Sequence, residues 1–110
     1  MSHRFDPTQI RWREPWQAIN PDQAQEFEDE VRREVCAEHA MFGRSAAVVG
    51  RRKDRDDFLF YLGNKPPRFA VVHLTFQKEK MPEWPKTTFF DSLEDWISLS
   101  MEPAANDYFP

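Results

Sequence analysis

The feature that most constrains this fold is a run of residues that is apolar on both sides of an extended chain. In residues 68–77 one side carries Ala70, Val72, Leu74 and Phe76, and the other carries Phe69, Val71, His73 and Thr75. Residues 57–62 repeat the pattern. A sheet built from such strands needs a covering layer on each face. We expect a helix to cover one face, and either the tryptophan-bearing ends of the chain or a second subunit to cover the other.

Three strand-like runs predict an antiparallel sheet. Residues 45–52, 57–62 and 68–77 are rich in Val, Phe and Leu and are separated by short polar connectors, a pattern typical of hairpins. Residues 87–90 follow a proline-containing loop and suit a short edge strand. The sequence therefore predicts a meander of three to four antiparallel strands.

Capping signals predict two helices. Asn20 is a good N-cap, a proline follows it at the first helical position, and an apolar stripe then continues to about Glu38. Near the other end of the chain, Asp91 and Glu94 form a capping-box pattern, and Pro103 is expected to end that helix. The predicted fold class is therefore α+β, with the N-terminal helix packed on the antiparallel meander and a short C-terminal helix.

Length and composition suit a single α+β domain over residues 1–110. We expect residues 1–19 to form an extended, aromatic lead-in and residues 102–110 to form a tail. No apolar run is long enough to cross a bilayer, the N-terminus lacks the apolar segment of a signal peptide, and Cys36 has no second cysteine to pair with. These features predict a cytoplasmic protein without membrane association.

The net charge of -4 conceals an uneven distribution along the chain. Residues 22–38 carry seven acids and two arginines, whereas residues 44–55 carry five basic residues and one acid. The overall acidic balance argues against a nucleic acid as partner. A basic hairpin between two acidic helices instead predicts a polarised surface that orients a protein partner.

Part of the sequence resembles known proteins. The chain is similar to a group of small, uncharacterised bacterial proteins that share a "VVHLT" strand, a Pro/Trp loop and a "SLEDW"-like C-terminal helix, which are here residues 71–75, Trp84-Pro85 and 92–96. The resemblance covers most of residues 10–100. It implies no activity, cofactor or partner and carries over no functional residue. The opening of the last helix also resembles helix openings in SUKH-type immunity proteins.

Signals for metal-dependent or nucleophilic chemistry are weak. Cys36 and His39 are three residues apart near the end of the first helix, and His73 is the third residue that a zinc site could use. The sequence has no glycine-rich phosphate loop and no signature of an activated thiol. We therefore predict no catalytic residue, no metal ligand and no cofactor.

His73 allows two interpretations. As a polar residue in an apolar strand it needs a hydrogen-bond partner, which a carbonyl, hydroxyl or carboxylate in the core would supply. Alternatively, His73, Tyr61 and Thr75 are the polar groups of a pocket between the sheet and the loop that carries Trp84. The first interpretation makes the histidine structural, and the second makes it part of a binding site.

Aromatic residues at the two ends of the chain also allow two interpretations. Trp12, Trp16, Tyr108 and Phe109 lie outside the predicted strands and helices, and Trp and Tyr are favoured anchors of protein interfaces. They form either an interface, with another protein or in a homodimer, or a layer over the protein's own core.

The sequence therefore supports two functional hypotheses. The first is a non-catalytic, cytosolic protein-interaction module, either self-associating or immunity-like, and it is favoured by the missing catalytic motif and the polarised, aromatic surface. The alternative is a small-ligand-binding protein or an enzyme with a pocket around His73, Tyr61 and the Trp84 loop.

Overall fold

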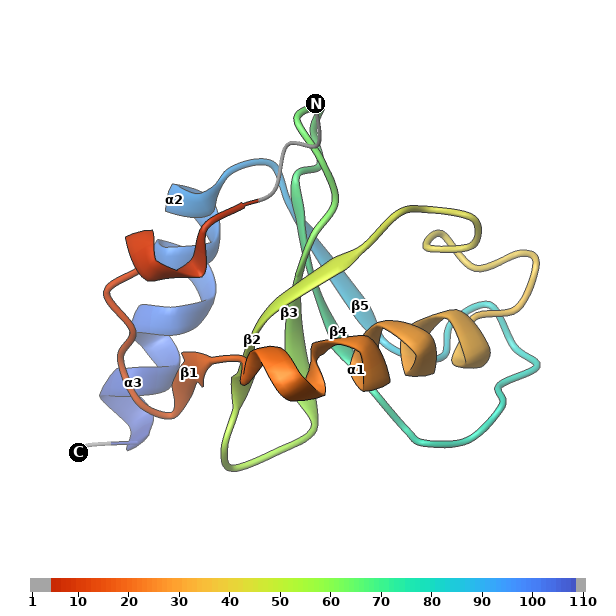
Figure 1. Cartoon of the computed structure of the whole chain (residues 1–110), viewed down its shortest axis with the longest axis horizontal. Coiled ribbons are helices and arrows are strands. Elements are labelled where there is room, and N and C mark those ends of the chain that lie inside the picture. The colour runs from red at the N-terminus through yellow and green to blue at the C-terminus, as the bar shows by residue number, and fades with distance from the viewer. Residues whose placement is uncertain (1–4, 109–110) are drawn as a thin grey trace.

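The computed structural model describes residues 5–108 and shows an antiparallel sheet with helices packed on both of its faces (Figure 1). Its five strands follow one another across the sheet in chain order. The elements are a 3₁₀ turn at Pro7–Gln9, β1 (Trp16–Ala18), α1 (Pro21–Glu34), β2 (Ala47–Arg52), β3 (Asp57–Tyr61), β4 (Phe69–His73), β5 (Thr87–Phe90), α2 (Leu93–Trp96), a π-helical segment at Ile97–Met101, and α3 (Glu102–Tyr108).

The α+β class and the antiparallel sheet are confirmed, with two corrections. The sheet has five strands rather than three or four, and α1 follows β1, so the helix is not the N-terminal element. The additional strand is β1, which pairs with the segment from Gly50 to Arg52 in β2. A strand of three residues is too short to show the two-residue alternation by which strands are predicted.

Helix α1 begins where its capping signal predicts and ends earlier than its apolar stripe predicts. The Asn20 side chain accepts a hydrogen bond from the Asp22 amide at 2.9 Å, and a proline occupies the first turn. Glu34 is the last helical residue because Val35 is extended, with φ -77° and ψ 129°. Among residues 5–108, no helix has the length and apolar character needed to cross a membrane.

The C-terminal helical run continues past Pro103 to Tyr108, so most of the predicted tail is helical. Proline in a regular α-helix clashes with the carbonyl four residues earlier and leaves it without a donor. Here Pro103 is the second residue after a π-helical segment, at whose end the Glu102 amide donates to the carbonyl of Ile97, five residues earlier. The wider turn gives this proline a place in the helix.

Two apolar clusters lie on opposite faces of the sheet. The first joins α1 to the sheet through residues that include Phe27, Phe58 and Val72. The second joins the lead-in and the C-terminal helices to the other face, and its members include Leu59 and Trp96. In Figure 1 the lead-in and the C-terminal helices lie together at one side of the sheet, while α1 crosses in front of it.

The tryptophan-bearing ends therefore cover the second face of the sheet. Trp16 and Trp96 are buried, and their rings meet edge to face, with centroids 5.3 Å apart at 84°. Trp12 packs on Trp96 from another side, at 5.9 Å between centroids. Of the two covers that the sequence left open for this face, the chain's own ends and a second subunit, the described residues show the first.

A glycine in β2 leaves the space in which the lead-in packs on the sheet. Gly50 lies at a register shift between β2 and β3, and a Cβ atom built at this position would overlap the ring of Trp12. The missing side chain at position 50 is therefore the space that Trp12 fills, and the close approach requires glycine for steric reasons.

Candidate functional site

The second face of the sheet has an open cleft over β3, β4 and β5. The cleft encloses about 390 Å³ and is lined by Arg55, Asp57, Val71, His73, Trp84, Lys86 and Thr88. Two pairs of lining residues are direct neighbours across the sheet, since Asp57 pairs with His73 and Val71 pairs with Thr88. The remaining residues come from the β2–β3 turn and from the loop 74–86.

His73 and Asp57 form the central contact of the cleft. The His73 Nδ1 atom lies 2.7 Å from Asp57 Oδ1, and the aspartate side chain is largely buried while 45% of the histidine side chain is exposed. An ionised carboxylate only accepts hydrogen bonds, so Nδ1 is the donor. The other ring nitrogen, Nε2, has no hydrogen-bond partner within residues 5–108. In the neutral ring Nε2 is therefore a hydrogen-bond acceptor.

Two cationic side chains flank the histidine. Arg55 comes from the turn between β2 and β3, and Lys86 comes from the residue just before β5. The Lys86 amine lies 5.4 Å from the centroid of the Trp84 ring, a cation–π arrangement that holds both side chains at the rim. With Asp57 as the only acid in the lining, the cleft combines a positive potential with an aromatic wall.

The structure brings two of the four predicted pocket residues together and separates the other two from them. His73 and Trp84 both line the cleft. Tyr61 lies at the far end of β3, where its ring contacts Phe69 and its hydroxyl donates to Asn64 Oδ1 at 2.6 Å. Thr75 lies beyond the end of β4, so it no longer shares the strand alternation with His73.

The residues considered as interface anchors have different surroundings. Trp16 is buried, and Trp12 packs against both Gly50 and Trp96. Tyr108 is 38% exposed and lies under the amine of Lys53, which is 5.5 Å from its ring centroid. Phe109 lies outside the described residues. The two tryptophans are thus packed inside the molecule, which accounts for them without an interface.

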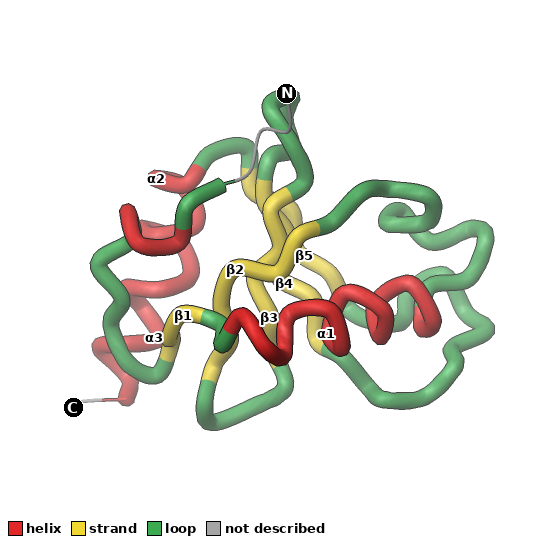
Figure 2. Tube along the Cα trace, in the orientation of Figure 1, coloured by secondary structure: helices red, strands yellow, loops and turns green. Residues whose placement is uncertain are grey.

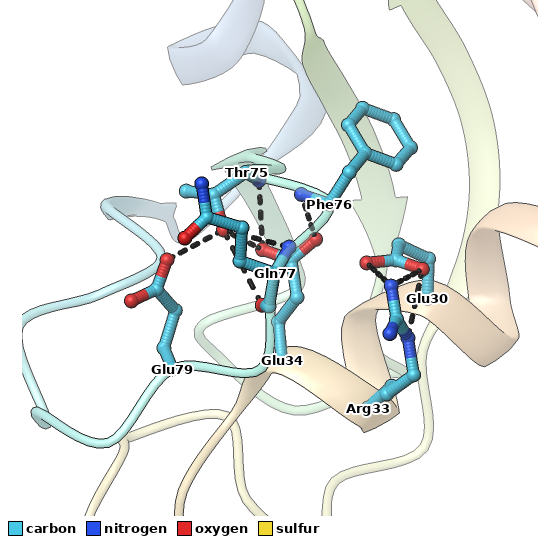
Figure 3. Close-up of polar contacts among 7 residues, drawn as sticks. All are labelled: Glu30, Arg33, Glu34, Thr75, Phe76, Gln77 and Glu79. Carbon is cyan, nitrogen blue, oxygen red and sulfur yellow. Dashed lines mark hydrogen bonds and ion pairs between the residues drawn. The ribbon is translucent and has the colours of Figure 1, made fainter.

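Sequence reasoning missed a buried carboxyl group beside the cleft loop (Figure 3). Glu34 is fully buried, and its two oxygens accept hydrogen bonds from the backbone amides of Thr75 and Phe76, both at 2.8 Å. Phe76 has a φ of +59°, so the chain turns sharply where it meets this carboxylate. Burial, followed by a hydrogen bond with Glu30, raises the pKa of Glu34 from 4.5 to about 7.

A signal for this group was present in the sequence. Glu34 follows Phe27 by seven residues and Val31 by three, so it lies on the apolar stripe of α1 rather than on the solvent side. An acid on an apolar stripe needs an internal partner. The partner itself was not predictable, because Thr75 and Phe76 are about forty positions away in the chain and lie in a loop without a regular pattern.

The buried His39 holds the other end of the same loop. Its Nδ1 accepts a hydrogen bond from the Met41 amide at 2.9 Å, so the proton is on Nε2, which lies 2.8 Å from the carbonyl oxygen of Pro85. The loop 74–86 is therefore held at both of its ends. Glu34 of α1 binds its first residues, and His39, which follows α1, binds Pro85 near its last residue. Figure 2 shows this loop and the connection between α1 and β2 at the same end of the molecule.

Two of the three candidate zinc ligands, His39 and His73, have other hydrogen-bond partners. His39 contacts Pro85, and His73 contacts Asp57. Within residues 5–108, no group of three or more His, Cys, Asp or Glu side chains has an arrangement that could hold a metal ion. The described cleft thus offers two cationic side chains, Arg55 and Lys86, to an anionic group.

Comparisons with known proteins leave the site to be interpreted from its own geometry. No family model matches the chain, and the searches of curated proteins and of solved structures found no significant match.

Proposed function

We propose that this protein is a non-catalytic interaction module that receives an acidic side chain of a protein partner in the His73 cleft. The observation that carries the proposal is the convergence of Arg55, His73 and Lys86 on one cleft, with Asp57 orienting the histidine ring. A carboxylate that enters the cleft meets two permanent cations, Arg55 and Lys86, and accepts a hydrogen bond from His73 Nε2 only when both ring nitrogens carry a proton. Charge-assisted hydrogen bonds of this kind are stronger than those between neutral groups.

The openness of the cleft favours a side chain of a large partner over a free small molecule. Small-molecule sites usually enclose 70–90% or more of the ligand surface. Here the His73 side chain is 45% exposed, and Trp84 at the rim is 36% exposed. A partner that also contacts the surface around the cleft gains the buried area that the cleft alone does not provide.

Trp84 supports a protein partner for a second reason. Tryptophan is enriched among the residues that contribute most to protein binding. The Lys86 amine lies 5.4 Å from the centroid of the Trp84 ring, and the next residue in the chain, Pro85, is buried. An anchor that is already ordered loses little conformational entropy when a partner binds.

The proposal is tested by titrating the ¹⁵N-labelled chain with an acetylated tetrapeptide of glutamate at low salt, and separately with a tetrapeptide of glutamine. We expect shifts of the His73, Trp84 and Lys86 amide signals with the glutamate peptide only. Lys86→Glu should weaken binding by tenfold or more, because it replaces an attractive charge with a repulsive one.

A charge reversal outside the cleft is the matched control. Lys65 is exposed in the β3–β4 connection, and Lys65→Glu changes the net charge as much as Lys86→Glu does. It should leave the affinity within about twofold. The proposal fails if the glutamate peptide does not shift the cleft signals, or if acetate and inorganic phosphate bind as tightly as the peptide. The second outcome would identify a site for small anions.

A further inference from the structure

The loop 74–86 connects the cleft to the buried carboxyl group of Glu34. It supplies Trp84 and Lys86 to the cleft, and its first residues are fixed to α1 by Glu34. Both carboxylate oxygens of Glu34 are used, since Oε1 accepts from the Thr75 amide and Oε2 accepts from the Phe76 amide. Glu34 thus holds the start of the loop, and the contact between His39 and Pro85 holds its end beside Trp84.

The hydroxyl of Thr75 lies between two carboxyl groups. Thr75 Oγ1 is 3.0 Å from Glu34 Oε1 and 2.6 Å from Glu79 Oε2 (Figure 3). A hydroxyl has one hydrogen and donates it to one acceptor at a time. For both contacts to be hydrogen bonds, one of the two carboxyl groups must carry a proton. The arrangement is thus complete only when the cluster holds an additional proton.

The other charged groups around Glu34 do not neutralise it. On α1, Glu30 is the neighbouring acid that helps to raise the pKa of Glu34, and Arg33 pairs with Glu30 rather than with Glu34. On the loop, the nearest acid is Glu79, while Lys78 and Lys80 are exposed and form no ion pair within residues 5–108. Glu30, Glu34 and Glu79 therefore form an acidic cluster without a cation bound to its buried member.

We propose that Glu34, Thr75 and Glu79 form a proton-controlled latch that holds the loop 74–86 closed against α1 and thereby regulates the cleft. The regulatory part rests on the proposed function of the cleft, whereas the latch itself does not. When the cluster is protonated, Glu34 is neutral and satisfied in its buried position. When the proton is lost, a buried charge faces two other acids, and the open loop, in which Glu34 meets water, becomes relatively more populated.

The direction of the pH effect follows from the two values of the pKa. Glu34 titrates at about 7 in the closed arrangement and near its ordinary 4.5 when water reaches it. The closed state thus binds the proton more tightly, so closure is favoured below pH 7 and weakened as the pH rises through 7. Between pH 6 and pH 8.5 the closing equilibrium should fall about tenfold.

The latch is tested by amide hydrogen exchange, corrected for the pH dependence of the intrinsic exchange rate. The protection factors of the Thr75 and Phe76 amides should fall about tenfold between pH 6 and pH 8.5. In Glu34→Gln, which resembles the protonated side chain, they should be independent of pH. Glu26→Gln, on the exposed side of the same helix, is the matched control and should retain the tenfold fall.

Leu59, which is fully buried in the middle of β3, distinguishes loop opening from unfolding of the whole domain. We expect Thr75 and Phe76 to be less protected than Leu59 at every pH, because the loop opens while the sheet remains folded. Equal protection would show that the loop opens only with global unfolding, and it would overturn the latch. A second measurement does not depend on any variant, since the ¹³C signal of the Glu34 carboxyl should titrate near pH 7. A midpoint below 5 would also overturn the proposal.

Peptide binding separates the latch from the function of the cleft. If the latch regulates the cleft, Glu34→Gln should bind the glutamate tetrapeptide more tightly than the native chain at pH 8.5 and equally at pH 6. Failure of the peptide to bind, with the tenfold fall in protection retained, would reject the cleft function and leave the latch. Binding with an unchanged Thr75 and Phe76 protection in the native chain would reject the latch and leave the cleft function.

Discussion

The two faces of the sheet are covered in different ways. The face under α1 is closed by apolar contacts such as the one between Phe27 and Phe58, whose ring centroids are 4.3 Å apart. The opposite face is closed in part by tryptophans and has the His73 cleft over β3, β4 and β5. The polar groups that could contact a partner thus lie where the second cover ends. In this fold the extent of a covering layer decides which part of an otherwise apolar sheet is available for binding.

The largest loss of stability should come from removing a tryptophan that covers the second face of the sheet. Trp96 is fully buried and contacts two other tryptophans, so Trp96→Ala should lower the free energy of unfolding by about 3–5 kcal/mol. Urea denaturation at pH 7 measures the change. Leu99→Ala in the same helical run is the control, because Leu99 is 69% exposed and its loss should cost less than about 0.5 kcal/mol. A cost below 1 kcal/mol for Trp96→Ala would mean that this cover is dispensable.

The next effect concerns the face under α1, where Glu34 titrates. Its pKa is raised from 4.5 to about 7 by burial, so the folded state binds the proton more tightly than the unfolded state. The associated stability is complete below pH 4.5 and is lost as the pH rises to about 7, a change on the order of 3 kcal/mol. Urea midpoints measured from pH 4.5 to 8 should show this fall. The same series in Glu34→Gln should lack it, and a parallel fall in both chains would contradict the assignment.

A smaller effect is expected where the lead-in meets the sheet. Gly50→Ala forces the new Cβ atom into the Trp12 ring and should destabilise the protein by about 1–3 kcal/mol. The size of the effect should depend on Trp12. In a chain that already carries Trp12→Ala, the same Gly50→Ala substitution should cost much less, and a double-mutant cycle measures this coupling. Additive effects would show that the two positions are independent.

The smallest effect on stability should come from the open part of the second face. The His73 and Asp57 pair is partly exposed, and pairs of this kind contribute about 0–1 kcal/mol. His73→Gln should therefore change the thermal midpoint by only a few degrees while it reduces binding of the glutamate tetrapeptide. Loss of stability comparable to that of Trp96→Ala would instead make His73 a structural residue, which is the other interpretation that its sequence position allows.

The features that could be predicted are those set by residues close together in the sequence, such as helix caps and the apolar pattern of a strand. Asn20 and the proline after it placed the start of α1, and the doubly apolar pattern of residues 68–77 predicted cover on both faces of the sheet. The end of α1 was not predictable in the same way. Its apolar stripe continues past Glu34, and the helix stops where Val35 becomes extended.

The candidate site was only partly predictable for a related reason. His73 and Trp84 were expected near each other because one is in the strand and the other in the loop that follows it. Asp57 was not expected, because an acid at the start of an apolar strand is typical of a solvated strand end. Its contact with His73 depends on the register between β3 and β4, and register is a property of the pairing rather than of either strand.

The π-helical segment at Ile97–Met101 places one extra residue in the last helical run. A π turn holds one residue more than an α turn, and one residue corresponds to about 100° of rotation around a helix axis. If one exposed residue such as Ser98 were deleted, the segment would become regular α-helix. The wider turn holds the extra residue, so the buried Ala104 and Ala105 would stay on about the same side of the helix. Pro103, however, would meet the backbone of the preceding turn. The length of this segment is thus fixed to a single residue, although its sequence on the exposed side is free to vary.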